Sequence, residues 1–247
     1  MLRTGATQGT RNMAVSTPLG EDVLLLDRMH ATERLGGLFV YTLDLLASDH
    51  DIKFEDVLGD NFTVRYELPG EENKTRFFNG FVSDFSHVGE RGHFAAYRAT
   101  LRPWLWFLTR TSDCRIFQEK TVPDIVKQVF RDHGFTDFEE RLKGKYRQWD
   151  YCAQYRETDF NFVSRLLEQE GIYYYFTHED GKHKLILADS YSAHEAYPGY
   201  DEIVLRPRDQ PTHEEGIYGW ETRKTVLPGL CALNAYDFEK PKADLKV

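Results

Sequence analysis

Cysteine is scarce in this sequence: Cys114, Cys152 and Cys231 are the only three among 247 residues, and they lie far apart. A disulfide framework needs an even set of cysteines, and a structural zinc site needs closely spaced Cys or His ligands. Neither pattern is present, so the sequence predicts no metal, no cofactor and thiols that stay reduced, as in the cytoplasm. Cys152 lies in a segment with strand character, which favours a small buried side chain over a nucleophile.

Long apolar runs are missing as well, since the longest covers only a handful of residues. A membrane-spanning helix needs about 20, so we expect no stable membrane association. The first dozen residues contain two arginines but no apolar core, which excludes a cleavable secretory signal at this end. We therefore expect residues 1–15 to be a flexible tail, and any export to use a route without a signal peptide.

Basic charge is outnumbered, with 31 Lys and Arg against 40 Asp and Glu, for a net charge of -9. Nucleic-acid binding needs a basic face that displaces phosphate counterions, so this balance argues against it. In the one basic run, over residues 141–147, Lys and Arg alternate with Leu, Gly and Tyr. This pattern is typical of a solvated strand or loop face.

Motifs of catalysis are also absent: no Gly-x-Ser-x-Gly turn, phosphate loop or dinucleotide fingerprint occurs. His178 and His183 flank a stretch similar to a zinc-protease motif, but that motif needs two histidines four apart on a helix. Here they are five apart, and Asp180-Gly181 between them predicts a polar hairpin turn. Asp49, His50 and Asp51 are ordinary loop residues, because no third ligand is placed beside them.

Carboxylates are numerous, and this leaves one enzymatic alternative open. A glycoside hydrolase acting on cell walls would need two carboxyl groups facing each other across a cleft, with pKa values pushed apart. Spacing along one sequence cannot place such a pair. We therefore assign no catalytic residue and predict that the chain is not an enzyme.

Aromatic residues, at 14%, and apolar residues, at 41%, are plentiful enough to form a real core. Residues 61–68 alternate apolar and polar side chains, the pattern of a strand with one buried face. Four further segments have strand character, and Gly or Pro-Gly turns separate several of them: 22–29, 39–47, 75–88 and 93–102. Antiparallel strands in succession predict a small β-barrel over residues 16–105.

The pattern changes after Trp104. Two helical segments follow, one capped by Thr121 and ended by Gly134, the other capped by Thr158 and ended by Gly171. A hairpin of residues 172–177 and 184–188 comes next. A proline-containing linker reaches residue 212, so residues 106–212 are predicted to be an α+β module with its linker.

Four consecutive aromatic residues, 173–176, place rings on both faces of the first hairpin strand, so both faces should be covered. Beyond the linker, residues 219–226 and 230–238 have the character of two strands joined by Pro228-Gly229. A lone pair of strands is marginally stable, so these should join another sheet.

Two stretches carry a family resemblance. Residues 114–125, CRIFQEKTVPDI, and residues 151–176, YCAQYRETDFNFVSRLLEQEGIYYYF, closely resemble the VgrG family of type VI secretion spike proteins. The segment TPLG at residues 17–20 and the run from residue 39 to 45 fit the opening strands of the same family. The resemblance covers nearly everything from Ser16 onward.

The resemblance implies a hub fused to a spike, similar to the parts of a contractile phage tail. Three chains would form a ring, and two similar barrels in each chain would let this trimer sit on the hexameric Hcp tube. An OB-like domain and a β-helix needle would follow, and some members add a toxic enzyme. Baseplate components, and effectors or their adaptors, would be the other partners, and the protein would leave the cytoplasm through the type VI apparatus.

The predicted fold is therefore a β-rich α+β chain: an antiparallel β-barrel, an α+β module, and the first strands of a second barrel at residues 213–247. The predicted function is mechanical, adapting a trimeric spike to the tube for contraction-driven injection. Two alternatives stay open. One is an adaptor surface that binds effectors or other cargo, and the other is the cell-wall glycoside hydrolase. By analogy with the family, the rest of the second barrel and everything after it lie beyond Val247.

Overall fold

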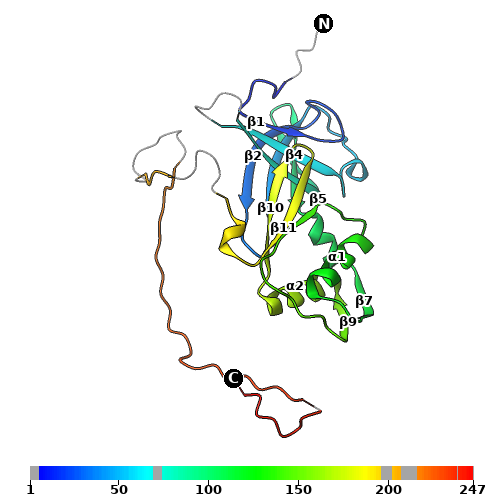
Figure 1. Ribbon diagram of the computed structural model, residues 1–247. Coiled ribbons are helices and arrows are strands. Elements are labelled where there is room, and N and C mark those ends of the chain that lie inside the picture. The colour runs from blue at the N-terminus through cyan, green and yellow to red at the C-terminus, as the bar shows by residue number, and fades with distance from the viewer. Residues whose placement is uncertain (1–5, 69–73, 196–201, 207–215, 238, 247) are drawn as a thin grey trace. The chain divides into compact units, whose positions relative to one another are not determined.

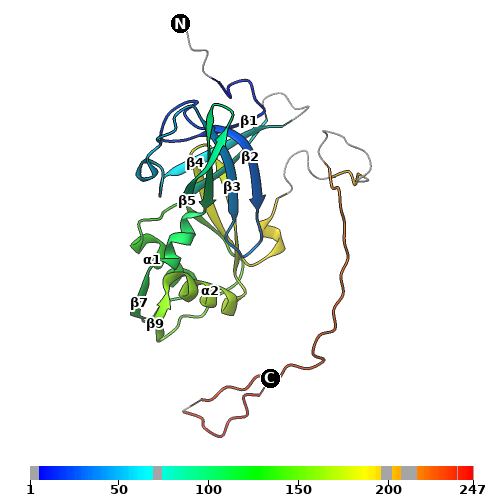
Figure 2. The same ribbon diagram turned by 180° about the vertical axis from the view of Figure 1, so that it is seen from behind.

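The computed structural model describes residues 6–68, 74–195, 202–206, 216–237 and 239–246. Its contacts divide the chain into two units, residues 1–195 and residues 196–247. Among these described residues, all the helices and strands lie in the first unit (Figures 1 and 2). Strands predominate in it, which confirms the predicted β-rich α+β fold.

The first half of the unit is one antiparallel sheet of six strands. Its members are β1 (Met13–Ser16), β2 (Leu25–Thr32), β3 (Val40–Ala47), β4 (Asn61–Glu67), β5 (Thr75–Arg91) and β6 (Phe94–Arg102). Their order across the sheet is β1-β4-β5-β6-β3-β2. The register of β5 against β6 shifts twice, and such bulges bend a strand and increase its twist. The sheet therefore curls into a half-barrel (Figures 1 and 2).

The curled sheet encloses a filled interior. Strand β3 alternates buried and half-buried side chains, and Tyr41, Leu43 and Leu45 point inward and are fully buried. Large side chains from several strands meet them there, among them Phe62, Tyr97 and Leu101. A 3-10 turn, η1 (Phe54–Asp56), lies between β3 and β4.

The two edge strands of the sheet, β1 and β2, are joined by one side chain rather than by a strand ladder. The amide of Gln8 donates to the carbonyls of Val15 (2.8 Å) and Leu24 (3.2 Å). It accepts from the backbone N–H groups of Val15 (3.0 Å) and Leu26 (3.2 Å). The prediction of a flexible tail over residues 1–15 is wrong for residues 8–15, because Gln8 is buried and β1 pairs with β4. Residues 1–5 lie outside the described residues.

The α+β part begins with the turn η2 (Trp104–Thr109), which buries Trp104, Leu105 and Leu108. The remaining elements of this part are β7 (Ser112–Phe117), α1 (Val122–Asp132), β8 (Phe138–Arg141), β9 (Cys152–Thr158), α2 (Asp159–Glu170), β10 (Tyr173–Glu179), β11 (Lys182–Ala188) and the turn η3 (Tyr191–Ala193). Strands β7 and β9 form one small sheet, and β10, β11 and β8 form another in that order. The second core lies between these sheets and the two helices.

Both helices begin and end where the sequence predicts. Thr121 and Thr158 accept the N-terminal backbone hydrogen bonds of α1 and α2, which would otherwise lack a partner. Gly134 and Gly171 follow the helices with φ of +79° and +71°, a conformation that glycine adopts without strain.

The hairpin β10–β11 joins the two halves of the unit. Phe176 packs against both cores, and its ring meets Phe39 of the curled sheet edge-on at 5.0 Å. Tyr174 is buried in the second core, while Tyr173 and Tyr175 lie on the other face of β10, against His194. Both faces of this aromatic strand are covered, as predicted.

The C-terminal unit contains no helix or strand among its described residues. The predicted strand 219–226 is absent, and so is the predicted strand 230–238 over its described residues, since Phe238 lies outside them. Both predictions are wrong for this chain, and the reason is physical: strands need a neighbour for their backbone hydrogen bonds, and the described part of this unit offers only the bridge between Leu205 and Ile217. Part of the predicted linker, 196–201 and 207–212, is outside the described residues.

Candidate functional site

A buried histidine, His183, and a half-buried one, His178, lie where the hairpin enters the curled sheet. His183 is only 2% exposed; its Nδ1 lies 2.7 Å from the Asn79 side-chain oxygen, and its Nε2 accepts from the Trp104 backbone N–H at 2.9 Å. A backbone N–H can only donate, so Nε2 is the acceptor and Nδ1 holds the proton. Burial lowers the pKa of His183 to about 3, which keeps the ring neutral.

His178 lies directly opposite His183 in the hairpin and makes a second link to the sheet. Its Nδ1 accepts from the Asn79 backbone N–H at 3.1 Å, and its Nε2 lies 3.1 Å from the hydroxyl of Tyr41, which donates to Glu33. Burial lowers the pKa of His178 to about 4. The hairpin turn was predicted, but its flanking histidines were interpreted as polar surface. They are instead the hydrogen-bonded joint between the two halves of the unit.

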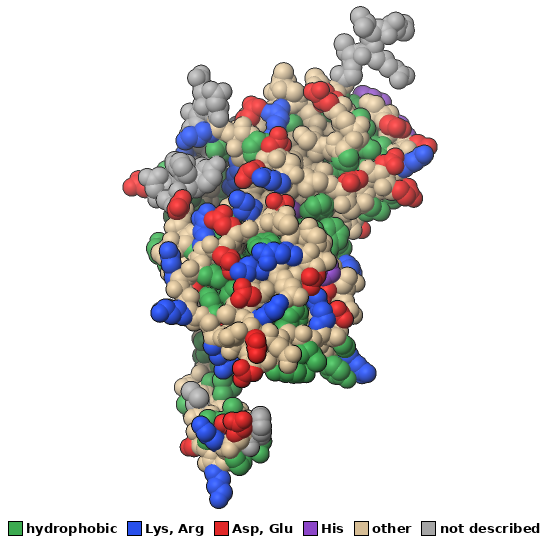
Figure 3. All heavy atoms as spheres, turned by 45° about the vertical axis from the view of Figure 1, so that its right-hand side comes forward, with side chains coloured by type: hydrophobic (Ala, Val, Ile, Leu, Met, Phe, Trp, Pro, Cys, Tyr) green, Lys and Arg blue, Asp and Glu red, His purple; other side chains and the backbone are tan. Residues whose placement is uncertain are grey.

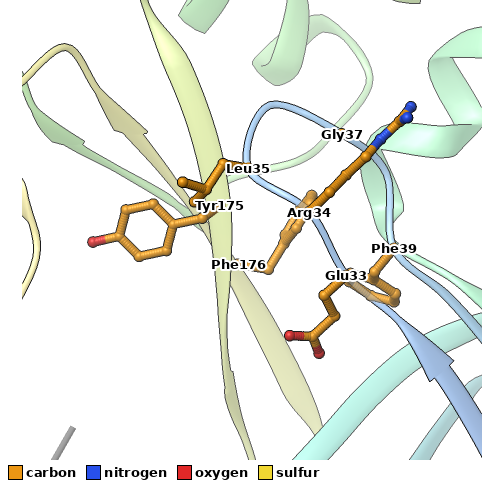
Figure 4. Close-up of a pocket in the computed structure, with 7 residues that line it drawn as sticks. All are labelled: Glu33, Arg34, Leu35, Gly37, Phe39, Tyr175 and Phe176. Carbon is orange, nitrogen blue, oxygen red and sulfur yellow. The ribbon is translucent and has the colours of Figure 1, made fainter. Parts of the chain in front are cut away.

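A groove of about 340 Å³ opens beside this joint (Figure 4). One wall is the loop after β2, and the other is β10. The residues that line it are Glu33, Arg34, Leu35, Gly37, Phe39, Tyr175 and Phe176. The loop is held to the edge of β10 by a hydrogen bond from the Gly36 N–H to the Tyr174 carbonyl at 2.8 Å. Leu35, at 64% exposure, leaves an apolar rim open to solvent.

A second apolar surface lies on the outer face of the sheet formed by β7 and β9. Phe117 and Cys152 face the core, whereas Ile116 and Tyr155 point outward and are 60% and 67% exposed. Cys152 is thus the buried small side chain that the sequence predicted, and burial raises the pKa of its thiol, which disfavours a nucleophilic thiolate. Exposed apolar side chains grouped in this way are typical of protein contacts.

A buried carboxylate ties the elements around this sheet together. Asp159, the first residue of α2, accepts hydrogen bonds of 2.7 Å from Arg115, Gln154 and Thr111, and its Oδ2 lies 2.7 Å from His133 Nε2. Burial alone would raise its pKa, but the bonds from Gln154, Thr111 and His133 and the charge of Arg115 lower it overall. Every oxygen lone pair is engaged, so this arrangement is structural.

The hydrolase alternative requires two carboxyl groups that share a surface depression. Asp124 and Glu140 line a depression of about 320 Å³, and the Lys127 ammonium lies 3.2 Å from Asp124 and 3.0 Å from Glu140. A hydrogen bond from Thr121 is the main cause that lowers the pKa of Asp124, and the contacts with Lys127 lower it further. A glycosidase needs one acid with a raised pKa, so this pair does not support one.

Within the described residues, no group of three or more His, Cys, Asp or Glu side chains is arranged to hold a metal ion. Asp49, His50 and Asp51 lie in an exposed loop, where Asp49 accepts from the Asp51 N–H and His50 faces Glu90. Nor does any helix in that part of the chain have the length and apolar character needed to cross a membrane. On the face drawn in Figure 3, acidic and basic side chains are interspersed.

A family model for the phage tail baseplate hub (GPD) matches residues 32–247. The chain belongs to this family. The type VI secretion system spike protein VgrG1a of Pseudomonas aeruginosa is 50% identical to this chain, over 97% of the chain and 37% of its own length. VgrG1b of the same organism is 48% identical, over 97% of this chain and 32% of its own length. The resemblance to VgrG proteins is therefore confirmed, and the chain spans about a third of the length of the curated relatives it matches.

Solved structures agree with this hub assignment. The c3393 protein of Escherichia coli, described as a component of the type VI secretion system with structural similarity to the T4 phage tail proteins gp27 and gp5, matches with a TM-score of 0.60 and 28% identity. That match covers 70% of this chain and 50% of the other. A Francisella PdpA–VgrG complex matches at a TM-score of 0.50 and 14% identity, over 72% of this chain and 31% of the other, which shows the shared fold.

Proposed function

We propose that this chain is the first part of the hub of a type VI secretion spike, where it works mechanically. The observation that carries the proposal is the match of the hub family over residues 32–247, together with relatives named as type VI spike proteins at about 50% identity. In this proposal three copies surround the tail axis and adapt the spike to the hexameric Hcp tube. Contraction of the sheath then drives the assembly, with its effectors, out of the cell.

The packing of the first unit suits a protein that must transmit the force of sheath contraction. The two cores are filled with aromatic and aliphatic side chains, and Phe176 belongs to both contact sets. The joint between them consists of neutral histidines whose ring nitrogens all have partners. A packed interior with a hydrogen-bonded joint resists deformation because any shift breaks contacts that have no replacement.

Its partners follow from the same proposal. They are two further copies of the chain, the Hcp tube, baseplate components, and effectors or their adaptors. The protein is made in the cytoplasm and leaves through the type VI apparatus. The predicted boundaries of first barrel, module and second barrel, at 105 and 212, remain predictions, since the first compact unit runs through residue 195.

Deletion and complementation test this proposal. The gene is deleted in its host and restored either with the wild-type sequence or with a Leu43→Asp version, which places a charge in the filled interior. We expect the tube protein in the culture medium to vanish on deletion, to return with the wild type and to stay absent with Leu43→Asp. Unchanged tube-protein export after deletion would overturn the proposal, provided that no second spike gene is present.

The groove beside the hairpin favours one second function, the binding of cargo. Its aromatic wall and open rim are typical of a site for a protein segment, and a VgrG protein of this fold is known in a complex with another protein, PdpA. A pull-down from host lysate with wild-type protein and with Leu35→Glu tests it. Leu58→Glu, at a comparably exposed leucine outside the groove, is the matched control. Loss of the same partner in both variants would contradict a role of the groove.

A further inference from the structure

One tryptophan ring on the surface of the first unit lies within cation–π range of two arginines. Trp106 belongs to the turn η2; the guanidinium carbon of Arg110 lies 4.4 Å from the centre of its ring, and that of Arg102 lies 5.6 Å from it. Both distances are within the range of about 6 Å over which an aromatic face attracts a cation. Arg102 ends β6 and Arg110 directly follows η2, so the three residues join the curled sheet to the module.

The ring is held in place from several sides. The Trp106 backbone N–H donates to the Pro103 carbonyl at 2.9 Å, and the Thr109 hydroxyl donates to the Trp106 carbonyl at 2.7 Å. Its ring meets that of Phe107 at 5.5 Å. The neighbouring Trp104 and Leu105 are buried and anchor the turn. Trp106 therefore presents a pre-formed surface for the two guanidinium groups.

Neither Arg102 nor Arg110 forms an ion pair or a side-chain hydrogen bond with any of the described residues. This contrasts with Arg115, which faces Asp113, Asp132 and Asp159. In a chain with 40 acidic and 31 basic residues, two neighbouring cations without a carboxylate are unexpected. A guanidinium stacked on a ring keeps its N–H edge available, because the contact uses the face of the group and not its donors.

We propose that Arg102, Trp106 and Arg110 form a docking site for an acidic segment of a partner protein. Carboxylates of that segment accept paired hydrogen bonds from the guanidinium forks, and its stem packs beside the indole. Arg and Trp are the residue types that most often dominate the energy of protein interfaces. Paired N–H···O bonds from a held guanidinium are also among the stronger polar contacts.

A protein partner fits this surface better than a nucleic acid does. Affinity for nucleic acid grows with the number of phosphates that basic residues neutralise, and this surface offers only two guanidinium groups. Two guanidiniums beside an indole can instead recognise two carboxylates on one short segment. This site goes beyond the proposed function, since it depends neither on the trimer nor on the tube.

The test measures binding of a fluorescein-labelled octaglutamate peptide to the whole chain by fluorescence anisotropy at low salt. We expect Arg102→Gln/Arg110→Gln to weaken binding about tenfold or more, because both charge-assisted contacts are lost. Trp106→Leu should weaken it several-fold, and Arg102→Lys/Arg110→Lys should give an intermediate loss, since charge remains without the fork. Octalysine and a single-stranded octanucleotide are the comparison probes.

Arg147→Gln is the matched control, because Arg147 lies alone over the ring of Trp149 at 4.3 Å. It should bind octaglutamate as the wild type does. Circular dichroism melts show that each variant is folded, so that a lost signal reports on binding. No octaglutamate binding by the wild type, equal losses in Arg147→Gln and the double variant, or tighter binding of the octanucleotide than of octaglutamate would each overturn the proposal.

Discussion

The side-chain amide of Gln8 satisfies both backbone groups of Val15, donating to its carbonyl at 2.8 Å and accepting from its N–H at 3.0 Å. A neighbouring strand would make the same pair of bonds. On its other side the same amide bonds to Leu24 and Leu26, at the start of the opposite edge strand. One glutamine therefore takes the place of a strand contact in the seam of the half-barrel.

Gln8→Ala should lower the free energy of unfolding by about 2–4 kcal/mol, because backbone groups on both edge strands lose their partner in a buried seam. Urea denaturation measures the loss, and hydrogen exchange should show faster exchange at the Val15 and Leu26 amides. Thr10→Ala, at an exposed position nearby in the chain, is the control and should change little. Equal stability of Gln8→Ala and Thr10→Ala would show that the bridge contributes nothing.

The histidine joint should make stability depend on pH. Burial lowers the pKa of His178 to about 4 and that of His183 to about 3, below the value of about 6.5 in an exposed histidine. Between these values the unfolded chain binds more protons than the folded one, so stability is greatest above about pH 6.5 and falls as the pH drops. The slope is about 1.4 kcal/mol per pH unit for each histidine. Glu33 and Arg76, which face His178, act in opposite directions on its pKa.

Urea midpoints measured from pH 7.5 to pH 4.5 test this dependence. Carboxylates whose pKa is lowered on folding, such as Asp159 and Asp189, lose their contribution mainly below about pH 4, so the histidines dominate this window. The double variant His178→Gln/His183→Gln should be less stable than the wild type at pH 7, but its stability should change much less with pH. His30→Gln, on the exposed part of β2, should keep it. A flat wild-type profile down to pH 5 would contradict burial of the pair.

Asp159→Asn should destabilise the α+β part by roughly 3 kcal/mol, because Arg115 is left without its buried partner and an amide N–H₂ must face hydrogen-bond donors. Thermal denaturation by circular dichroism measures the change. Asp132→Asn removes a carboxylate that also faces Arg115, at 3.3 Å but at the surface, and should cost less than about 1 kcal/mol. A similar cost for the two variants would mean that burial does not strengthen the contact.

Leu166→Asp should unfold the α+β part, because a charge would replace a fully buried side chain on the inner face of α2. The expected cost is on the order of 4 kcal/mol or more. Gln169→Asp introduces the same carboxylate on the exposed side of the same helix and should stay folded. A soluble Leu166→Asp protein with a cooperative melt near the wild-type temperature would contradict the packing of α2.

Several parts of the fold could be predicted because their signals are local. The cap residues Thr121 and Thr158 and the apolar stripes of the two helices act within one or two turns of backbone. The turn at Gly181, with φ of +76°, places the hairpin for the same reason. The strands of residues 219–226 and 230–238 were predicted from equally local patterns, yet the described residues of both ranges form no strand, because a strand also needs a neighbour to pair with.

The sequence by itself determined the family, strands β2 to β6 of the curled sheet, both helices and the hairpin β10–β11, because periodicity, caps and turns depend on neighbours along the chain. Only the tertiary structure decided what Gln8, His178, His183 and Asp159 do, since each acts on residues distant in the sequence. A polar side chain is equally compatible with water and with a buried partner. Which of the two it meets depends on the folded arrangement that brings the partner to it.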